Sequence, residues 1–126
     1  MSPKYTISVE CGFSASHTLS RCPPCDRLHG HSWRVKSEWV FDSLDESGMG
    51  ANFTRLQRVL DEKILRSFDH RHLNEAVPFD SVEPTAENMA REFYRILLEE
   101  SKQLSLGRLS RITVWEGPVN SVAYEE

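Results

Sequence analysis

Hydrophobic and polar residues alternate along two long stretches in the first third of the chain. From position 5 to 17, and again from 29 to 41, most odd positions are apolar or histidine, whereas most even positions are small, polar or charged. A period of two is typical of a strand with one buried face, so we predict strands over 5–17 and 29–41. Sequential strands joined by a short connection commonly pair antiparallel, and we expect that arrangement here.

Apolar residues then recur at three- and four-residue spacing, which predicts two helices. The first should follow an N-cap at Asn52 and run to about Ser67, with an apolar stripe of Phe53, Leu56, Leu60 and Ile64. The second should follow Pro84-Thr85 and end near Gln103, with a stripe of Ala90, Phe93 and Leu97.

Two shorter strands are expected after the helices, from Arg108 to Glu116 and from Ser121 to Glu125. The order strand, strand, helix, helix, strand, strand predicts an α+β fold, a four-stranded antiparallel sheet with two helices on one face. A chain of 126 residues with 39% hydrophobic and 27% charged residues suits a single domain over 1–126.

Charge and hydropathy exclude several classes of partner. The net charge is −4 and no basic tract offsets it, which argues against nucleic-acid binding. No apolar run approaches the ~18 residues of a membrane span, and no signal peptide is evident. With only three cysteines, the chain is expected to be cytoplasmic with reduced thiols.

Three histidines fall at matching ends of the first two predicted strands. His17 ends the first strand, and His29 and His31 begin the second on the same alternating face. Antiparallel pairing would bring all three to one end of the pair. A lone histidine on an apolar face is usually a core residue, but three convergent imidazoles suit zinc, with nitrogen ligands at about 2.0–2.1 Å and the fourth position open for chemistry.

Other polar residues have both a chemical and a surface interpretation. Cys22-Pro-Pro-Cys25 could be a redox pair or half of a zinc site, and a thiol beside zinc could act as nucleophile or base. Asp69-His70 could be a solvated loop. Glu116 shares a strand face with apolar residues, so it either reaches solvent at the strand end or binds a donor-rich group.

Together these residues resemble the 6-pyruvoyl-tetrahydropterin synthase superfamily over nearly the whole chain. The resemblance is carried by Phe13-Ser14-Ala15-Ser16-His17, Cys25-x-x-x-His29-Gly30-His31, Gly48-Met49, Asn52-Phe53, Asp69-His70, Leu73-Asn74, Pro84-Thr85-Ala86-Glu87-Asn88 and Glu116. The three residues between Cys25 and His29 resemble the queuosine-pathway 6-carboxy-tetrahydropterin synthase branch. The chain departs from the family pattern at Asn52, where Asp is usual, at Gly117, where Thr is typical, and at the additional Cys22.

The resemblance implies a tunnelling fold and a zinc-dependent lyase. Its substrate would be 7,8-dihydroneopterin triphosphate, and its products 6-carboxy-tetrahydropterin, acetaldehyde and triphosphate. It further implies a role for each matching residue: zinc ligands His17, His29 and His31, a base Cys25, a proton relay Asp69 and His70, and pterin contacts Glu116, Thr85 and Glu87. The cations nearest the motif, as candidates for the triphosphate, are Arg21, Arg27 and Arg34.

A four-stranded sheet also leaves two edges to be covered. The resemblance implies that they are joined in a homo-oligomer, a trimer or hexamer, whose active sites lie between subunits and receive Asp69 and His70 from a neighbouring chain. Two alternatives remain open from the sequence. One is a pyruvoyl synthase, which eliminates triphosphate but keeps the substrate side chain, and the other is a non-catalytic protein that binds pterin or zinc.

Overall fold

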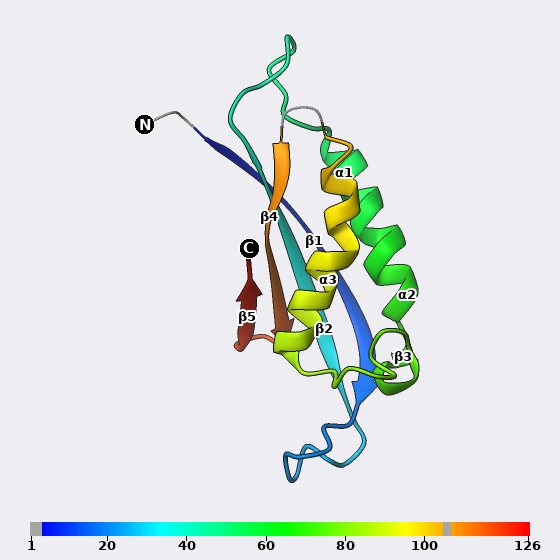
Figure 1. The fold of residues 1–126 in the computed structure, drawn as a ribbon. Coiled ribbons are helices and arrows are strands. Elements are labelled where there is room, and N and C mark those ends of the chain that lie inside the picture. The colour runs from blue at the N-terminus through cyan, green and yellow to red at the C-terminus, as the bar shows by residue number, and fades with distance from the viewer. Residues whose placement is uncertain (1–3, 105–106) are drawn as a thin grey trace.

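The computed structural model describes residues 4–104 and 107–126, and it begins with a long antiparallel pair of strands (Figure 1). Strand β1 (Tyr5–His17) pairs with β2 (His29–Phe41) without interruption, from Tyr5 opposite Phe41 to His17 opposite His29. The alternation therefore predicted both strands and their pairing correctly. The register also places His17 and His29 directly across from each other at one end of the sheet.

The sheet has five strands, in the order β3-β1-β2-β4-β5. Strand β4 (Gly107–Glu116) pairs antiparallel with β2, and β5 (Ser121–Tyr124) pairs antiparallel with β4. The prediction of four antiparallel strands was wrong, because β3 (Arg71–His72) adds to β1 in the parallel direction. A strand of two residues is too short to produce a period-two pattern, so nothing in the sequence marked it.

The first predicted helix is one helical segment with a change of winding in its middle. It consists of α1 (Phe53–Leu60), a π-helical turn η1 (Asp61–Leu65) and α2 (Arg66–Phe68). The cap prediction is confirmed, because the side-chain oxygen of Asn52 accepts a hydrogen bond from the Thr54 amide at 2.8 Å. Asn52 therefore performs this capping role even though Asp is usual at that position.

The second helix, α3 (Ala86–Ser101), begins after the predicted cap Thr85, whose Oγ1 accepts from the Asn88 amide at 3.0 Å. It ends two residues before the predicted Gln103. A single 3-10 turn, η2 (Leu73–Glu75), lies between β3 and the loop that leads to α3. No helix among the described residues is both long and apolar enough to cross a membrane.

The hydrophobic core lies between one face of the sheet and the helices, which all cover that same face (Figure 1). The inward odd positions of β1 and β2 meet the apolar stripes of α1 and α3, and the aromatic members include Phe13, Trp33, Phe68 and Phe93. His17 continues this inward series, is itself fully buried and is the last residue of β1. The core face therefore ends at the histidines.

Candidate metal and thiol site

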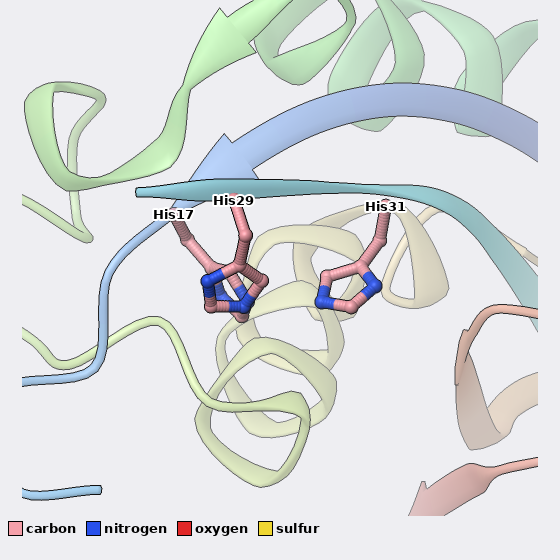
Figure 2. A group of neighbouring side chains, drawn as sticks. All are labelled: His17, His29 and His31. Carbon is pink, nitrogen blue, oxygen red and sulfur yellow. The ribbon is translucent and has the colours of Figure 1, made fainter. Parts of the chain in front are cut away.

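The three predicted histidines converge at the end of the β1–β2 pair (Figure 2). One ring nitrogen from each of His17, His29 and His31 lies within 4.8 Å of the others. The ring centroids are 4.5 Å apart for His17 and His29, 5.1 Å for His17 and His31, and 4.9 Å for His29 and His31. Among the described residues these three side chains form a group that could hold a metal ion.

Hydrogen bonds orient two of the rings for this task. Nδ1 of His17 lies 2.8 Å from the carbonyl oxygen of Pro84, and Nδ1 of His29 lies 2.7 Å from the carbonyl oxygen of Arg27. A carbonyl only accepts, so each Nδ1 carries the proton and donates it. The Nε2 lone pairs of His17 and His29 are then available, which is how a carbonyl in the outer shell normally presents a histidine to a metal.

Two buried ring nitrogens have no hydrogen-bond partner in the described part of the chain, Nε2 of His17 and Nε2 of His31. A buried polar atom without a partner is costly, and native structures generally provide one. Burial also lowers the pKa of His17, so this imidazole is neutral near pH 7, the form that binds metal. The donor set and its unpaired nitrogens therefore fit a metal ion.

Glu116 ends β4 beside this group. One of its carboxylate oxygens lies 3.3 Å from Nε2 of His31, a close contact that does not have hydrogen-bond geometry. The carboxylate is about one-third exposed, so it is accessible from the sheet end. The next residue, Gly117, has a φ of +87°, a conformation that a threonine could adopt only with strain.

The loop between β1 and β2 carries Cys25 and is fastened at several points. The side chain of Asn74 makes two hydrogen bonds to the main chain of Thr18. Its Oδ1 accepts from the Thr18 amide at 2.9 Å, and its Nδ2 donates to the Thr18 carbonyl oxygen at 3.0 Å. The carboxylate of Glu83 accepts from the amide and the hydroxyl of Ser20 at 2.5 and 3.2 Å. The loop is therefore held by residues from η2 and from the segment before α3.

Within the loop, the sulfur atoms of Cys22 and Cys25 lie 2.7 Å apart. This hydrogen bond is the main cause of a raised pKa for the Cys25 thiol, and partial burial and the negative charge of Glu116 act in the same direction. The loop that carries Cys25 leaves β1 at His17 and enters β2 at His29, so it lies at the end of the sheet where the histidines converge.

Asp69 and His70 lie on the other edge of the sheet, where the chain enters β3. One carboxylate oxygen of Asp69 accepts from the amide of Ser14 at 3.0 Å and lies 2.9 Å from Nδ1 of His70. The Ser14 bond is the main cause of a lowered pKa for Asp69, so the residue is ionised. The imidazole of His70 is 82% exposed, and its φ of 59° is unusual for a residue other than glycine.

Asp69 and His70 therefore form a pair, but in this chain they are not brought to the thiol. No hydrogen bond or ion pair joins them to Cys25 or to the three histidines among residues 4–104 and 107–126. β3 and β4 flank the β1–β2 pair on opposite sides, so the His70 pair and Glu116 lie on opposite sides of the histidines.

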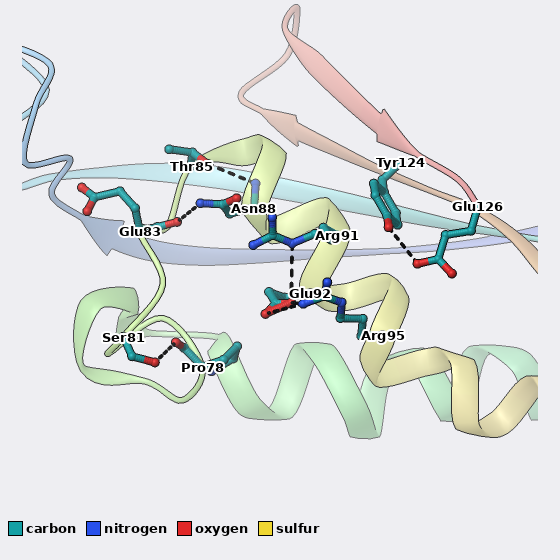
Figure 3. Close-up of polar contacts among 10 residues, drawn as sticks. All are labelled: Pro78, Ser81, Glu83, Thr85, Asn88, Arg91, Glu92, Arg95, Tyr124 and Glu126. Atoms are coloured by element: carbon teal, nitrogen blue, oxygen red, sulfur yellow. Dashed lines mark hydrogen bonds and ion pairs between the residues drawn. The ribbon is translucent and has the colours of Figure 1, made fainter.

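Thr85 and Glu87 lie at the start of α3, next to the carbonyl that orients His17. Figure 3 shows the cap contact between Thr85 and Asn88. Thr85 uses its oxygen as the helix cap, which leaves its hydroxyl proton free to be donated. Asn88 ties the same segment together by donating to the carbonyl oxygen of Glu83 at 2.9 Å. Glu87 is exposed in the first turn of the helix.

The three candidate arginines do not share one environment. Arg21 and Arg27 are exposed on the cysteine loop. Arg34 is an even position of β2 and lies on the sheet face opposite the histidines, where its guanidinium stacks 4.0 Å above Trp115 and pairs with Glu10 at 3.6 Å. Within one chain, Arg34 therefore does not lie near the histidines.

Four contributors to this site were not predicted from the sequence. They are the carbonyls of Pro84 and Arg27, the carboxylate of Glu83 and the side-chain amide of Asn74. Main-chain carbonyls carry no sequence signal, and Glu83 resembles any other surface carboxylate. Asn74 belongs to the Leu73-Asn74 motif, but nothing in the sequence indicates that it binds the main chain of Thr18.

The fold and site together define an α+β protein with a candidate metal centre at one end of its sheet, facing a loop that carries a thiol. Comparison with known proteins gives the family. The model of the family "6-pyruvoyl tetrahydropterin synthase" matches residues 6–126. The chain belongs to this family.

Relatives with two different named activities are about equally similar. The chain is 34% identical to the 6-carboxy-5,6,7,8-tetrahydropterin synthase of Synechocystis, covering 75% of this chain and 76% of that protein. It is 33% identical to human 6-pyruvoyl tetrahydrobiopterin synthase, covering 94% and 90%. The structure of Caenorhabditis elegans 6-pyruvoyl tetrahydropterin synthase superimposes with a TM-score of 0.83 at 25% identity, covering 98% and 96% of the two chains.

Proposed function

We propose that this protein is a zinc-dependent lyase of one tunnelling-fold domain, which converts 7,8-dihydroneopterin triphosphate to 6-carboxy-5,6,7,8-tetrahydropterin, acetaldehyde and triphosphate. The observation that carries the proposal is the group of three histidines with two unpaired buried nitrogens, beside a fastened thiol loop. Relatives named as 6-carboxy-tetrahydropterin synthases support the product. We place the reaction in queuosine biosynthesis on the family resemblance, and in the cytoplasm because the three cysteines are expected to be reduced thiols.

His17, His29 and His31 would hold the zinc ion, which would supply Lewis-acid polarisation of the substrate side chain. The ion is inferred to be zinc because three neutral imidazoles with an open position are a common zinc donor set. The carbonyls of Pro84 and Arg27 keep Nδ1 of His17 and His29 protonated and so keep their rings in the binding orientation.

Glu116 is proposed to recognise the pterin ring. Its carboxylate is accessible at the sheet end, and it can accept two parallel hydrogen bonds from neighbouring N–H donors of an aminopyrimidinone. Thr85 and Glu87 lie at the start of α3 and are proposed to complete the pocket, Thr85 through its free hydroxyl proton. The exposed Arg21 and Arg27 are the candidates in this chain for the triphosphate.

Cys25 is proposed as the base that removes a proton from the substrate side chain, for which it must be a thiolate. Asp69 and His70 are proposed to return protons, with the carboxylate holding Nδ1 of the exposed ring. Because no hydrogen bond or ion pair among the described residues joins this pair to Cys25 or to the three histidines, we propose that it serves the thiol of a neighbouring subunit in a trimer or hexamer.

Product analysis tests the proposal. The zinc-loaded protein is incubated with 7,8-dihydroneopterin triphosphate, and products are identified by mass spectrometry, with Cys25→Ala as the inactive control. We expect 6-carboxy-tetrahydropterin together with acetaldehyde. A product that keeps the side chain would instead identify a pyruvoyl synthase, the alternative favoured by the wide match to the human enzyme. Unchanged substrate bound to the protein would indicate a non-catalytic pterin-binding protein.

A further inference from the structure

Two of the three cysteines form a pair at the tip of the molecule. The sulfur atoms of Cys22 and Cys25 are 2.7 Å apart, with Cys22 exposed and Cys25 partly exposed. The third cysteine, Cys11, is buried among core side chains, and burial is the main reason why its pKa is raised to about 12. The two loop thiols are therefore accessible to reagents, whereas Cys11 serves as an internal control.

The main chain of the loop holds the pair together. The amide of Asp26 donates to the carbonyl oxygen of Cys22 at 3.1 Å, and the amide of Leu19 donates to the carbonyl oxygen of Cys25 at 2.9 Å. The two residues between the cysteines are prolines, whose fixed φ angles leave this stretch little conformational freedom. The contact between the sulfurs is thus a property of the folded loop.

We propose that Cys22 and Cys25 form a reversible dithiol–disulfide site that is oxidised by low-molecular-weight disulfides. The site gives Cys22, which the proposed reaction does not use, a function of its own. The expected effect on activity rests on the proposed function, because a disulfide would remove the Cys25 thiolate on which turnover depends.

The exchange balances without any further oxidant. One cysteine thiolate attacks a sulfur of the small disulfide, so a mixed disulfide forms and one small thiol leaves with a proton. The second cysteine then attacks the protein sulfur of the mixed disulfide, forming the Cys22–Cys25 bond and releasing the second small thiol. Two protein thiols are oxidised, and one small disulfide is reduced to two thiols.

Oxidised glutathione and mass spectrometry of the intact protein test the site independently of activity. The wild-type protein should lose two hydrogens and carry no glutathione, with the new bond mapped to Cys22 and Cys25 and reversed by dithiothreitol. In Cys22→Ser, the second step is blocked, so Cys25 should instead retain a glutathione adduct. Stable adducts on the wild-type protein, or thiols that remain free in excess oxidised glutathione, would overturn the proposal.

Activity measured on the same samples tests the consequence. Turnover of 7,8-dihydroneopterin triphosphate should fall in proportion to the oxidised fraction and return fully on reduction. Full turnover by the oxidised protein would overturn the inhibitory role while leaving the mass result in place. A reduced protein that never turns over this substrate would instead count against the proposed function, so the two failures are distinguishable.

Discussion

Nδ1 of His17 donates a hydrogen bond to the carbonyl oxygen of Pro84, across 2.8 Å of the buried interior. This bond joins the last residue of β1 to the segment that caps α3 with Thr85. The backbone at Pro84-Thr85 thus holds both His17, a proposed metal ligand, and Thr85, a proposed pterin contact. The relative position of metal and substrate would then depend on this stretch more than on the exposed loop.

Loss of one histidine should remove the metal. His29→Ala is expected to weaken zinc binding by more than the roughly 100-fold upper range for loss of an outer-shell partner, because it removes a ligand itself. His72→Ala is the matched control, since His72 bonds to Ser16 and lies outside the group of three. The zinc content per chain is measured for both variants after dialysis. A full equivalent of zinc retained by His29→Ala would exclude the assignment.

Cys25 and Cys22 should differ in their effect on turnover. Cys25→Ala is expected to lower turnover on the order of 10²–10⁴-fold, the usual contribution of a general base, while zinc remains bound. Cys22→Ala should keep turnover because the base is intact. Equal loss in both variants would show that the two thiols share the role.

Cys22→Ala should also move the pH profile. The hydrogen bond with Cys22 raises the pKa of Cys25, so its removal should lower that pKa and give more thiolate at a given pH. The acid limb of the profile of kcat/KM against pH should therefore move to lower pH. An unchanged acid limb, or a shift to higher pH, would show that Cys22 does not raise the pKa of the Cys25 thiol.

The anchor of the cysteine loop can be tested separately from its thiol. Asn74→Ala removes two hydrogen bonds and leaves the amide and carbonyl of Thr18 without their partners, which should lower the free energy of unfolding by about 1–3 kcal/mol. Ser81→Ala is the control, because Ser81 makes one exposed bond to Pro78 and should change stability by no more than about 0.5 kcal/mol (Figure 3). Denaturant unfolding measures both, and equal effects would show that Asn74 is not an anchor.

The elements marked by a periodic pattern of hydrophobic residues or by a cap residue were predictable from the sequence. The alternation that ends at His17 and resumes at His29 gave two strands, and antiparallel pairing then brought the histidines together as expected. The caps at Asn52 and Thr85 followed from their side-chain oxygens. In each case a short local pattern determines the conformation.

Contacts between distant backbone segments were not predictable in the same way. β3 is two residues long and lies beside β1, where the amide of His70 donates to the carbonyl oxygen of Ser14, 56 positions earlier. The carbonyl of Pro84 and the carboxylate of Glu83 likewise act on partners more than 60 positions away. Such contacts depend on the packed arrangement of the whole chain, which local periodicity does not encode.

The final prediction concerns the division of the site between subunits. Asp69 and His70 lie at the β3 edge, on the other side of the histidines from Glu116, and His70 is 82% exposed. If the pair serves a neighbouring thiol, Cys25→Ala and His70→Ala proteins, each inactive alone, should regain activity when unfolded together and refolded as mixed oligomers. Some interfaces would then combine an intact thiol with an intact relay, in a fraction set by random mixing.

The controls for this mixing experiment separate assembly from chemistry. Native mass spectrometry must show that mixed oligomers formed, and each variant refolded alone must remain inactive. Mixing Cys25→Ala with Cys25→Ser should restore nothing, since neither chain supplies a thiol at that position. Mixed oligomers without recovered turnover would mean that each chain contains its complete set of Cys25, Asp69 and His70, and the shared site would have to be abandoned.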